Sequence, residues 1–368
     1  MTTPILFSPL RLRGLELPNR IVVSPMAQYS ADGGVATDWH LMHMGNLSVS
    51  GAGLFITEAT SIEADARVSP HCLGLWSDVH EEALARVIGF CRRHGGARLG
   101  IQLMHSGRKG SVGAPWQGQK EVAAADGGWQ TCSPSEVPFA GRSAPRPLSR
   151  DDLAAVRQRY VDAALRADRI GFDLLEIHNA HGYLLHSFLS PLSNHRTDEY
   201  GGTLENRMRF PLEVFRALRD VWPERKPIGV RISATDWTPD GWTLDESVQF
   251  AAALRELGCD YITASSGGSS SDQQIPVGPG YQLPFAERIR REAGIPTMGV
   301  GLITQPEQAE RALAEGKADL LALGRAMMYQ PRWAWHAAEK LGADAYFPPQ
   351  YARSHPSMRH RDFLKATR

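Results

Sequence analysis

Short runs of apolar, β-branched residues alternate with longer amphipathic stretches along almost the whole chain. Eight of these runs have the length of strands and are apolar on both faces, which is typical of buried parallel strands. The stretches between them have the 3.6-residue periodicity of helices, and several open with Ser, Thr or Asp at a suitable capping position. The predicted strands are 20–25, 53–59, 98–104, 172–178, 227–233, 259–265, 295–301 and 318–324, and the clearest helices are 79–94, 151–170, 204–221, 244–257, 284–293 and 306–315.

Eight strands that are each followed by a helix favour a (β/α)8 barrel of the α/β class over an open, doubly wound sheet. No Pro/Ser-rich linker or charge block divides the chain, so we expect a single domain, 1–368, with the barrel at about 20–340. A plain barrel needs only about 250 residues. The surplus would form a β-hairpin within 1–19 that closes the bottom, a loop at 105–148 on the active face, and a tail at 341–368.

Composition narrows the functional classes. The 368 residues carry 40 basic and 40 acidic side chains, which gives no electrostatic reason to expect a nucleic-acid or anionic-membrane partner. No apolar stretch approaches the roughly 18 residues of a membrane span, and the N-terminus lacks the pattern of a signal peptide. Four cysteines without a C-x-x-C pair are expected to be reduced and structural. We therefore expect a soluble, cytoplasmic protein.

The carboxyl ends of barrel strands carry the chemistry in this architecture, and here they hold an unusual set of polar residues. Arg231, in the apolar context GVRIS, would need a buried anion or acceptor. Gly301 and Gly324 allow close approach of an anion after the last two strands, and Arg325 can clamp a phosphate. Gln102 offers both a donor and an acceptor to a heterocyclic edge. Each residue alone could be structural, but together they need a common ligand.

Two histidines three residues apart, His178 and His181, follow the fourth strand. This spacing also suits a pair of metal ligands, with Glu58, Glu176 or Asp236 completing the site. A metal-dependent barrel hydrolase is therefore the alternative function.

Several long motifs resemble the old yellow enzyme family of FMN-dependent ene-reductases. They are RIVVSPMAQYS, ITEATSI, GIQLMHSGRKG, EIHNAHGYLLHSFLSPLSNHRTDEYGG, ENRMRF, GVGLIT and LGRAMM, and the resemblance spans residues 4–353. The segments QLMHSGRK and QYAR make the thermophilic-like subclass, also grouped with xenobiotic reductases, the most similar. The resemblance implies a non-covalent FMN in the barrel mouth, held by Ser24, Pro25, Met26, Ala27, Ala59, Gln102, Arg231, Val300, Gly301, Gly324 and Arg325.

The resemblance also implies a reaction. NADPH, or NADH, reduces the flavin, which then passes hydride to the β-carbon of an α,β-unsaturated carbonyl or nitro compound. His178 and His181 would donate hydrogen bonds to the acceptor oxygen, Tyr183 would supply the proton, and Tyr29 would reach the substrate. A flavin-binding protein without turnover, such as a sensor, is a further alternative.

Two features concern subclass details. Ala27 stands where the subclass typically has a cysteine beside the flavin. The segment PQYAR at 349–353 resembles one whose arginine enters a neighbouring active site, so Arg353 is expected to reach a partner in a homodimer or a tetramer of dimers, with Tyr351 packing nearby.

Overall fold

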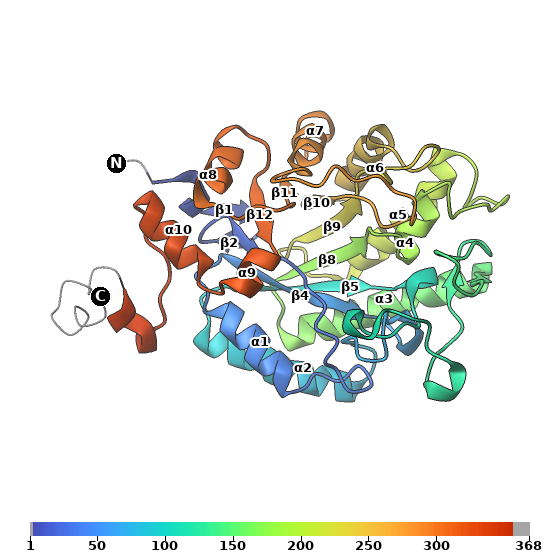
Figure 1. Ribbon diagram of the computed structural model, residues 1–368, viewed down its shortest axis with the longest axis horizontal. Helices are drawn as coiled ribbons and strands as arrows, with labels where there is room; N and C mark the ends of the chain where they lie inside the picture. Colours follow the sequence, from blue (N-terminus) through green and yellow to red (C-terminus); the bar gives the residue numbers. More distant parts are fainter. Residues whose placement is uncertain (1–2, 356–368) are drawn as a thin grey trace.

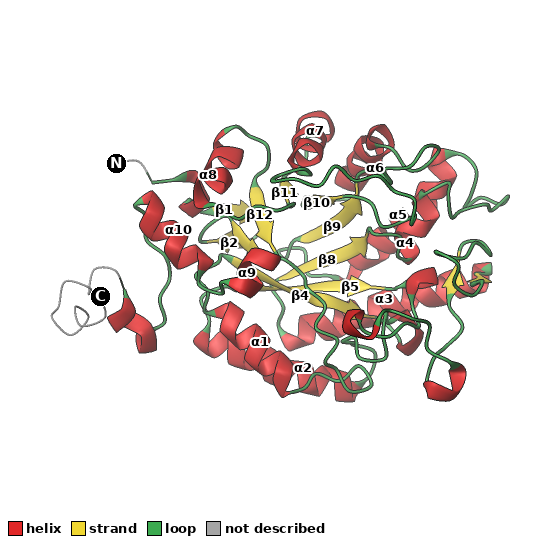
Figure 2. Ribbon diagram, viewed as in Figure 1, coloured by secondary structure: helices red, strands yellow, loops and turns green. Residues whose placement is uncertain are grey.

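The computed structural model describes residues 3–355, and its centre is a closed barrel of eight parallel strands (Figures 1 and 2). Neighbouring strands follow one another in sequence, and β12 pairs with β3 to close the ring. All eight predicted strands are confirmed, because runs apolar on both faces are buried between the barrel interior and the surrounding helices. The strands are β3 (Ile21–Val23), β4 (Leu54–Ser61), β5 (Arg98–Met104), β8 (Leu174–Asn179), β9 (Ile228–Ser233), β10 (Tyr261–Ser265), β11 (Thr297–Gly299) and β12 (Leu320–Leu323).

Helices surround the barrel (Figure 2). The six predicted from periodicity are present as α2 (Asp78–His94), α3 (Arg150–Ile170), α5 (Leu204–Val221), α6 (Leu244–Glu256), α7 (Leu283–Ala293) and α8 (Pro306–Ala314). Periodicity did not predict α1 (Asp38–Ser48), whose apolar and polar residues are poorly segregated, or the wholly buried α4 (Leu184–Leu189). Two more helices lie near the C-terminus, α9 (Arg325–Tyr329) and α10 (Trp333–Leu341).

The predicted N-terminal hairpin closes the barrel from below. Strands β1 (Leu10–Leu12) and β2 (Leu15–Leu17) pair antiparallel. Leu12 and Leu17 are buried in one cluster with inward-facing strand residues such as Leu54 and Met298. At the turn, Arg13 forms a 2.6 Å ion pair with Asp260, which precedes β10. The barrel therefore has an apolar floor at the amino ends of its strands.

Strand β8 carries polar side chains into the barrel interior above that floor. Leu174 belongs to the floor cluster, whereas Leu175 and Ile177 pack outward in the main core. Because side chains alternate along a strand, Glu176 and His178 point inward like Leu174. They lie two and four residues further along the strand, toward its carboxyl end. Glu176 is fully buried and His178 lies at the mouth.

The segment 105–148 is irregular, as predicted. It contains the short 3₁₀ helices η3 (Gly107–Lys109), η4 (Pro115–Gln117) and η5 (Ala124–Asp126), and the two-residue strands β6 (Cys132–Ser133) and β7 (Arg146–Pro147). Of the predicted tail, the structure describes residues up to 355, including η6 (Pro349–Ser354); residues 356–368 lie outside the described part. Within residues 3–355, every helix is too short or too polar to cross a membrane.

Candidate active site

A cavity of about 290 Å³ opens at the carboxyl ends of β3 and β9 to β12. Its lining brings together most of the residues predicted to hold a cofactor: Ser24, Pro25, Met26, Arg231, Val300, Gly301, Gly324 and Arg325. Gly301 has φ +114°, a conformation that L side chains rarely adopt. The remaining three predicted residues, Ala27, Ala59 and Gln102, do not line this cavity, although Ala59 and Gln102 are paired neighbours on β4 and β5.

A buried network of charged and polar groups lies beneath the mouth. The Gln102 side-chain amide donates to Glu176 Oε1 at 2.7 Å, and the Thr263 hydroxyl donates to Glu176 Oε2. Burial raises the pKa of Glu176, while the Arg231 guanidinium opposes that rise. Arg231 donates to Ser24 Oγ at 3.3 Å, and its Nε is buried without a hydrogen-bond partner. An unpartnered guanidinium N–H beside the cavity is a donor for an anionic or carbonyl-bearing ligand.

The two predicted histidines face each other at the end of β8. His178 Nε2 lies 3.2 Å from His181 Nδ1. Burial, reinforced by Arg231, lowers the pKa of both rings, so both are neutral. The Ala180 N–H donates to His178 Nδ1 at 3.2 Å, which places the ring proton of His178 on Nε2. That N–H therefore points at His181 and at the space between the rings.

Two residues that sequence reasoning missed continue this chain of hydrogen bonds. His181 Nε2 lies 2.8 Å from Ser265 Oγ, and Ser265 donates to Gln282 Oε1 at 3.2 Å. Both line the cavity. Ser265 ends the sixth predicted strand, so the strand-end rule could have included it. Gln282 follows a long loop, and the chain around it carries no comparable signal.

Tyr183 stands beside the histidine pair because of a tight turn after β8. His181 and Gly182 both have positive φ, +59° and +73°. Tyr183 then packs edge-on against His178, with ring centroids 4.9 Å apart. It shares a small apolar cluster with Tyr29 and Ala59, two residues predicted to meet substrate or flavin. Burial raises the pKa of Tyr183, so its hydroxyl keeps its proton at neutral pH.

The predicted active-site loop, 105–148, reaches this turn through η3. Lys109 Nζ donates to the backbone carbonyls of His181 at 2.8 Å and of Gly268 at 2.7 Å. Burial lowers the pKa of Lys109 to about 7, with further contributions from Arg142 and Arg108. Lys109 therefore ties the turn at His181 and Gly182 to the loop after β10.

The carboxylates that could complete a metal site have other partners. Glu58 Oε1 lies 3.3 Å from His40 Nε2, and Asp236 Oδ1 lies 3.2 Å from His186 Nε2. Glu176 is engaged by Gln102 and Thr263. Residues 3–355 contain no group of three or more His, Cys, Asp or Glu side chains arranged to hold a metal ion.

Arg353 does not join this site within its own chain. It lies exposed on η6, the short red helix before the grey trace, at the end of the molecule away from the arrowheads of β5, β8 and β9 (Figure 1).

A closed parallel barrel with a histidine pair, a tyrosine and a buried arginine around one mouth defines a barrel enzyme that works at the carboxyl face. The model of the NADH:flavin oxidoreductase / NADH oxidase family matches residues 5–344. The chain therefore belongs to this family, the old yellow enzyme family, and is an oxidoreductase of the NADPH dehydrogenase type. Membership implies a flavin and a nicotinamide nucleotide.

Individual relatives agree with the family match. The chain is 45% identical to an NADPH dehydrogenase of Geobacillus thermodenitrificans and 42% identical to one of Listeria innocua, in each case over 95% of this chain and 98% of the relative. Among solved structures, morphinone reductase in complex with tetrahydroNAD matches with a TM-score of 0.76 and 28% identity, over 96% of this chain and 94% of that one.

Proposed function

We propose that the protein is an FMN-dependent ene-reductase that takes electrons from NADPH, or NADH, and reduces α,β-unsaturated carbonyl or nitro compounds. The observation that carries this proposal is the convergence on one mouth of the His178–His181 pair, Tyr183 and a cavity lined by Arg231. A metal-dependent hydrolase would need carboxylates free to bind a metal, whereas Glu58, Glu176 and Asp236 have other partners.

The residues of the cavity fit a flavin mononucleotide. Arg231, with its unpartnered Nε, would face the end of the ring system that becomes negative on reduction. Gly301, Gly324 and the exposed Arg325 would accept the phosphate. The bound flavin supplies hydride chemistry; the protein supplies the position of the substrate and its proton.

The histidine pair would bind the acceptor oxygen between His178 Nε2 and His181 Nδ1. Two donors are needed there, and His181 becomes the second when its proton lies on Nδ1. In that tautomer His181 Nε2 is an acceptor, and the Ser265 hydroxyl, 2.8 Å away, would turn its proton from Gln282 Oε1 to His181 Nε2. Neutral imidazoles polarise the conjugated bond without adding a buried charge.

Tyr183 would protonate the α-carbon. Its hydroxyl stays protonated because burial raises its pKa, and the turn through Gly182 fixes its ring against His178. Tyr29, in the same apolar cluster, would close the far side of the substrate.

A spectroscopic experiment on the purified protein tests the function. We expect a yellow protein whose flavin absorbance is bleached by NADPH without oxygen and restored by an enone such as cyclohexenone. In Tyr183→Phe, the bleaching step should keep its rate within about twofold, and recovery should slow by about 10²- to 10⁴-fold, the usual contribution of a general acid. A colourless protein that requires zinc would contradict the proposal, and unchanged recovery in Tyr183→Phe would remove the tyrosine from the mechanism.

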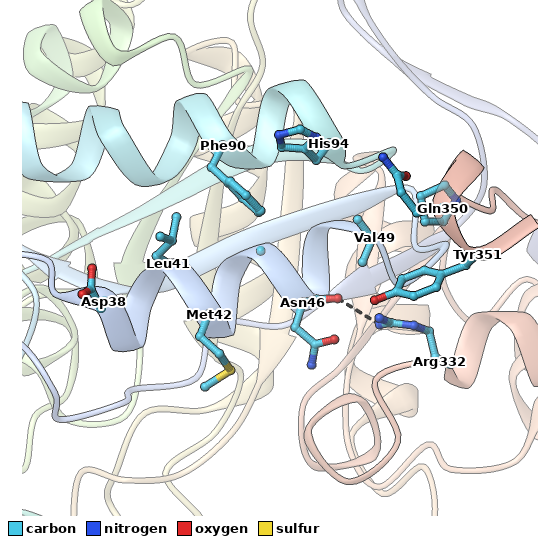
Figure 3. Close-up of a pocket in the computed structure, with 12 residues that line it drawn as sticks. Asp38, Leu41, Met42, Asn46, Val49, Phe90, His94, Arg332, Gln350 and Tyr351 are labelled. Atoms are coloured by element: carbon cyan, nitrogen blue, oxygen red, sulfur yellow. Dashed lines mark hydrogen bonds between the residues drawn. The ribbon is translucent and has the colours of Figure 1, made fainter.

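We further propose that the enzyme is a homodimer, or a tetramer of such dimers, in which Arg353 lines the partner's site. An apolar groove of about 530 Å³ lies between α1, α2 and η6, as Figure 3 shows for Leu41, Met42, Phe90 and Tyr351. Met42 and Tyr351 are about half exposed in the isolated chain, and so is Trp39 nearby on α1. A contiguous exposed apolar surface of this kind is typical of an interface.

Sedimentation and kinetics test this assembly. We expect a dimer or tetramer at micromolar concentration, and Met42→Asp should shift it toward the monomer. Arg353→Ala should raise KM for the enone while leaving the assembly intact. Unchanged kinetics in assembled Arg353→Ala would make Arg353 a surface residue, and a monomeric wild type would refute the assembly.

A further inference from the structure

A cluster of three side chains outside the proposed catalytic mouth joins a thiol, an imidazole and a carboxylate. Cys132 Sγ lies 3.6 Å from His105 Nε2, and Glu63 Oε1 lies 3.4 Å from the same nitrogen. His105 is 2% exposed, and Glu63 is held on its other oxygen by Arg159 at 2.7 Å. Three residues far apart in the sequence thus converge on one ring nitrogen.

The hydrogen bonds of His105 determine which of its two ring nitrogens carries the proton. The Gly107 N–H donates to His105 Nδ1 at 3.0 Å, so the ring carries its proton on Nε2. Burial lowers the pKa of His105, while Cys132 and Glu63 raise it, to about 10. A cationic ring would carry a second proton on Nδ1 and lose the bond from Gly107, but in both forms Nε2–H lies between the carboxylate and the sulfur. A thiolate at Cys132 would therefore accept a hydrogen bond from an imidazole held in place by Glu63.

Arg146 is the neighbour of Cys132 in the short two-stranded sheet. Strands β6 and β7 pair the two residues in register, Cys132 with Arg146 and Ser133 with Pro147. Arg146 is itself paired with Asp152 at 2.7 Å, which holds its guanidinium in place. The thiolate is the nucleophilic form of a cysteine, and a thiolate formed at Cys132 would have these groups beside it.

The other three cysteines are buried, and their surroundings raise the pKa of the thiol. Cys72, Cys91 and Cys259 are buried, whereas Cys132 is partly exposed. Burial raises the pKa of Cys72 to about 12 and that of Cys91 to about 11, and it also raises the pKa of Cys259. They serve as internal controls in the same molecule.

We propose that Cys132 is a covalent modification site for Michael acceptors, with His105 and Glu63 positioning the reacting sulfur. The reagent class is that of the proposed substrates, and to this extent the inference rests on the proposed function. The thiol loses its proton to solvent, and a sulfur electron pair forms a C–S bond to the β-carbon. The π electrons of the double bond move to the carbonyl as an enolate, which takes a proton from water at the α-carbon. The product is a thioether, with no change of oxidation state and no leaving group.

Labelling of the purified holoenzyme with N-ethylmaleimide tests this site. The reaction is run at pH 7 without nicotinamide nucleotide and followed by intact mass and peptide mapping. We expect one adduct, on Cys132, forming at least about 100-fold faster than adducts on the other cysteines, which must wait for local opening of the fold. Cys132→Ser should lose the fast adduct, and His105→Leu should slow it about tenfold, the value of one lost hydrogen bond to a charged group.

The outcomes separate this site from the proposed function. A fast adduct on another cysteine, or labelling of Cys132 no faster than that of the buried thiols, would overturn the inference. Wild-type labelling decides the matter even if His105→Leu fails to fold. Enone reduction, measured on unlabelled protein, reports on the proposed function alone, because thiol addition needs neither flavin turnover nor NADPH.

Discussion

The turn that aims Tyr183 depends on a glycine, and replacing Gly182 by alanine should disrupt it in a measurable way. Gly182 has φ +73°, and a Cβ added to it would lie 2.4 Å from the Gly268 carbonyl oxygen and 3.0 Å from Ser269 Cα. These are backbone atoms of the loop after β10, and Lys109 ties that same loop to His181. No flexible side chain can move aside to relieve the contact.

The magnitude follows from two separable costs. A left-handed conformation costs an L-residue about 1 to 2 kcal/mol, and overpacking against a fixed neighbour typically adds about 1 to 3 kcal/mol. Gly202→Ala is the matched control, because Gly202 has φ +80° but nothing within 4 Å of the position that a Cβ would take. We therefore expect the control to lose about 1 to 2 kcal/mol of unfolding free energy and Gly182→Ala to lose about 2 to 5 kcal/mol.

Two assays separate stability from positioning. Urea unfolding of both variants gives the free energies, and stopped-flow recovery of the reduced flavin with an enone measures the half-reaction in which Tyr183 is proposed to act. Relief of the contact requires a shift of about 1 Å beside Tyr183, which can cost about 100-fold in rate, whereas Gly202→Ala should recover at the wild-type rate. Equal losses of stability and rate in the two variants would refute the close-packed turn.

Three further predictions concern charge and redox chemistry. The pKa of Lys109 in the folded protein is lowered to about 7, so above that pH the unfolded chain binds more protons than the folded one. The stability of wild type relative to Lys109→Met should therefore rise between about pH 7 and about pH 10.5 and stay level outside that window. Urea unfolding at several pH values measures this difference. A flat difference would mean that Lys109 titrates normally. Arg231→Met leaves Glu176 buried without its compensating charge, so the unfolding free energy of the apoprotein should fall by about 3 kcal/mol at neutral pH and by less near pH 4. The double variant Arg231→Met/Glu176→Gln should regain much of this stability. Additive losses in the double variant would show that the two residues are not coupled. Ala27→Cys should shift the flavin reduction potential in a redox titration if the proposed flavin lies beside this position, and an unchanged potential would leave position 27 a steric role.

Local patterns in the sequence determined most of the architecture. The eight strands, the six clearest helices and the N-terminal hairpin all follow from apolar periodicity and from the small number of ways in which βα units can close. The strand-end rule also selected Arg231, His178 and the glycines of the cavity, because alternation along a strand fixes which side chains face inward. The helix α1 was missed since its apolar residues do not form a clear stripe.

Tertiary structure decided how these residues meet. The approach of His178 Nε2 to His181 Nδ1 depends on a left-handed turn at His181 and Gly182, which periodicity does not encode. Gln282 reaches Ser265 across a long loop, and the separation of Arg353 from its own mouth depends on the path of the C-terminal segment. The pairing of Cys132 with His105 and Glu63 is likewise a long-range contact. Periodicity is a local property of a few residues, whereas these contacts depend on how distant turns pack, and only the folded chain brings them together.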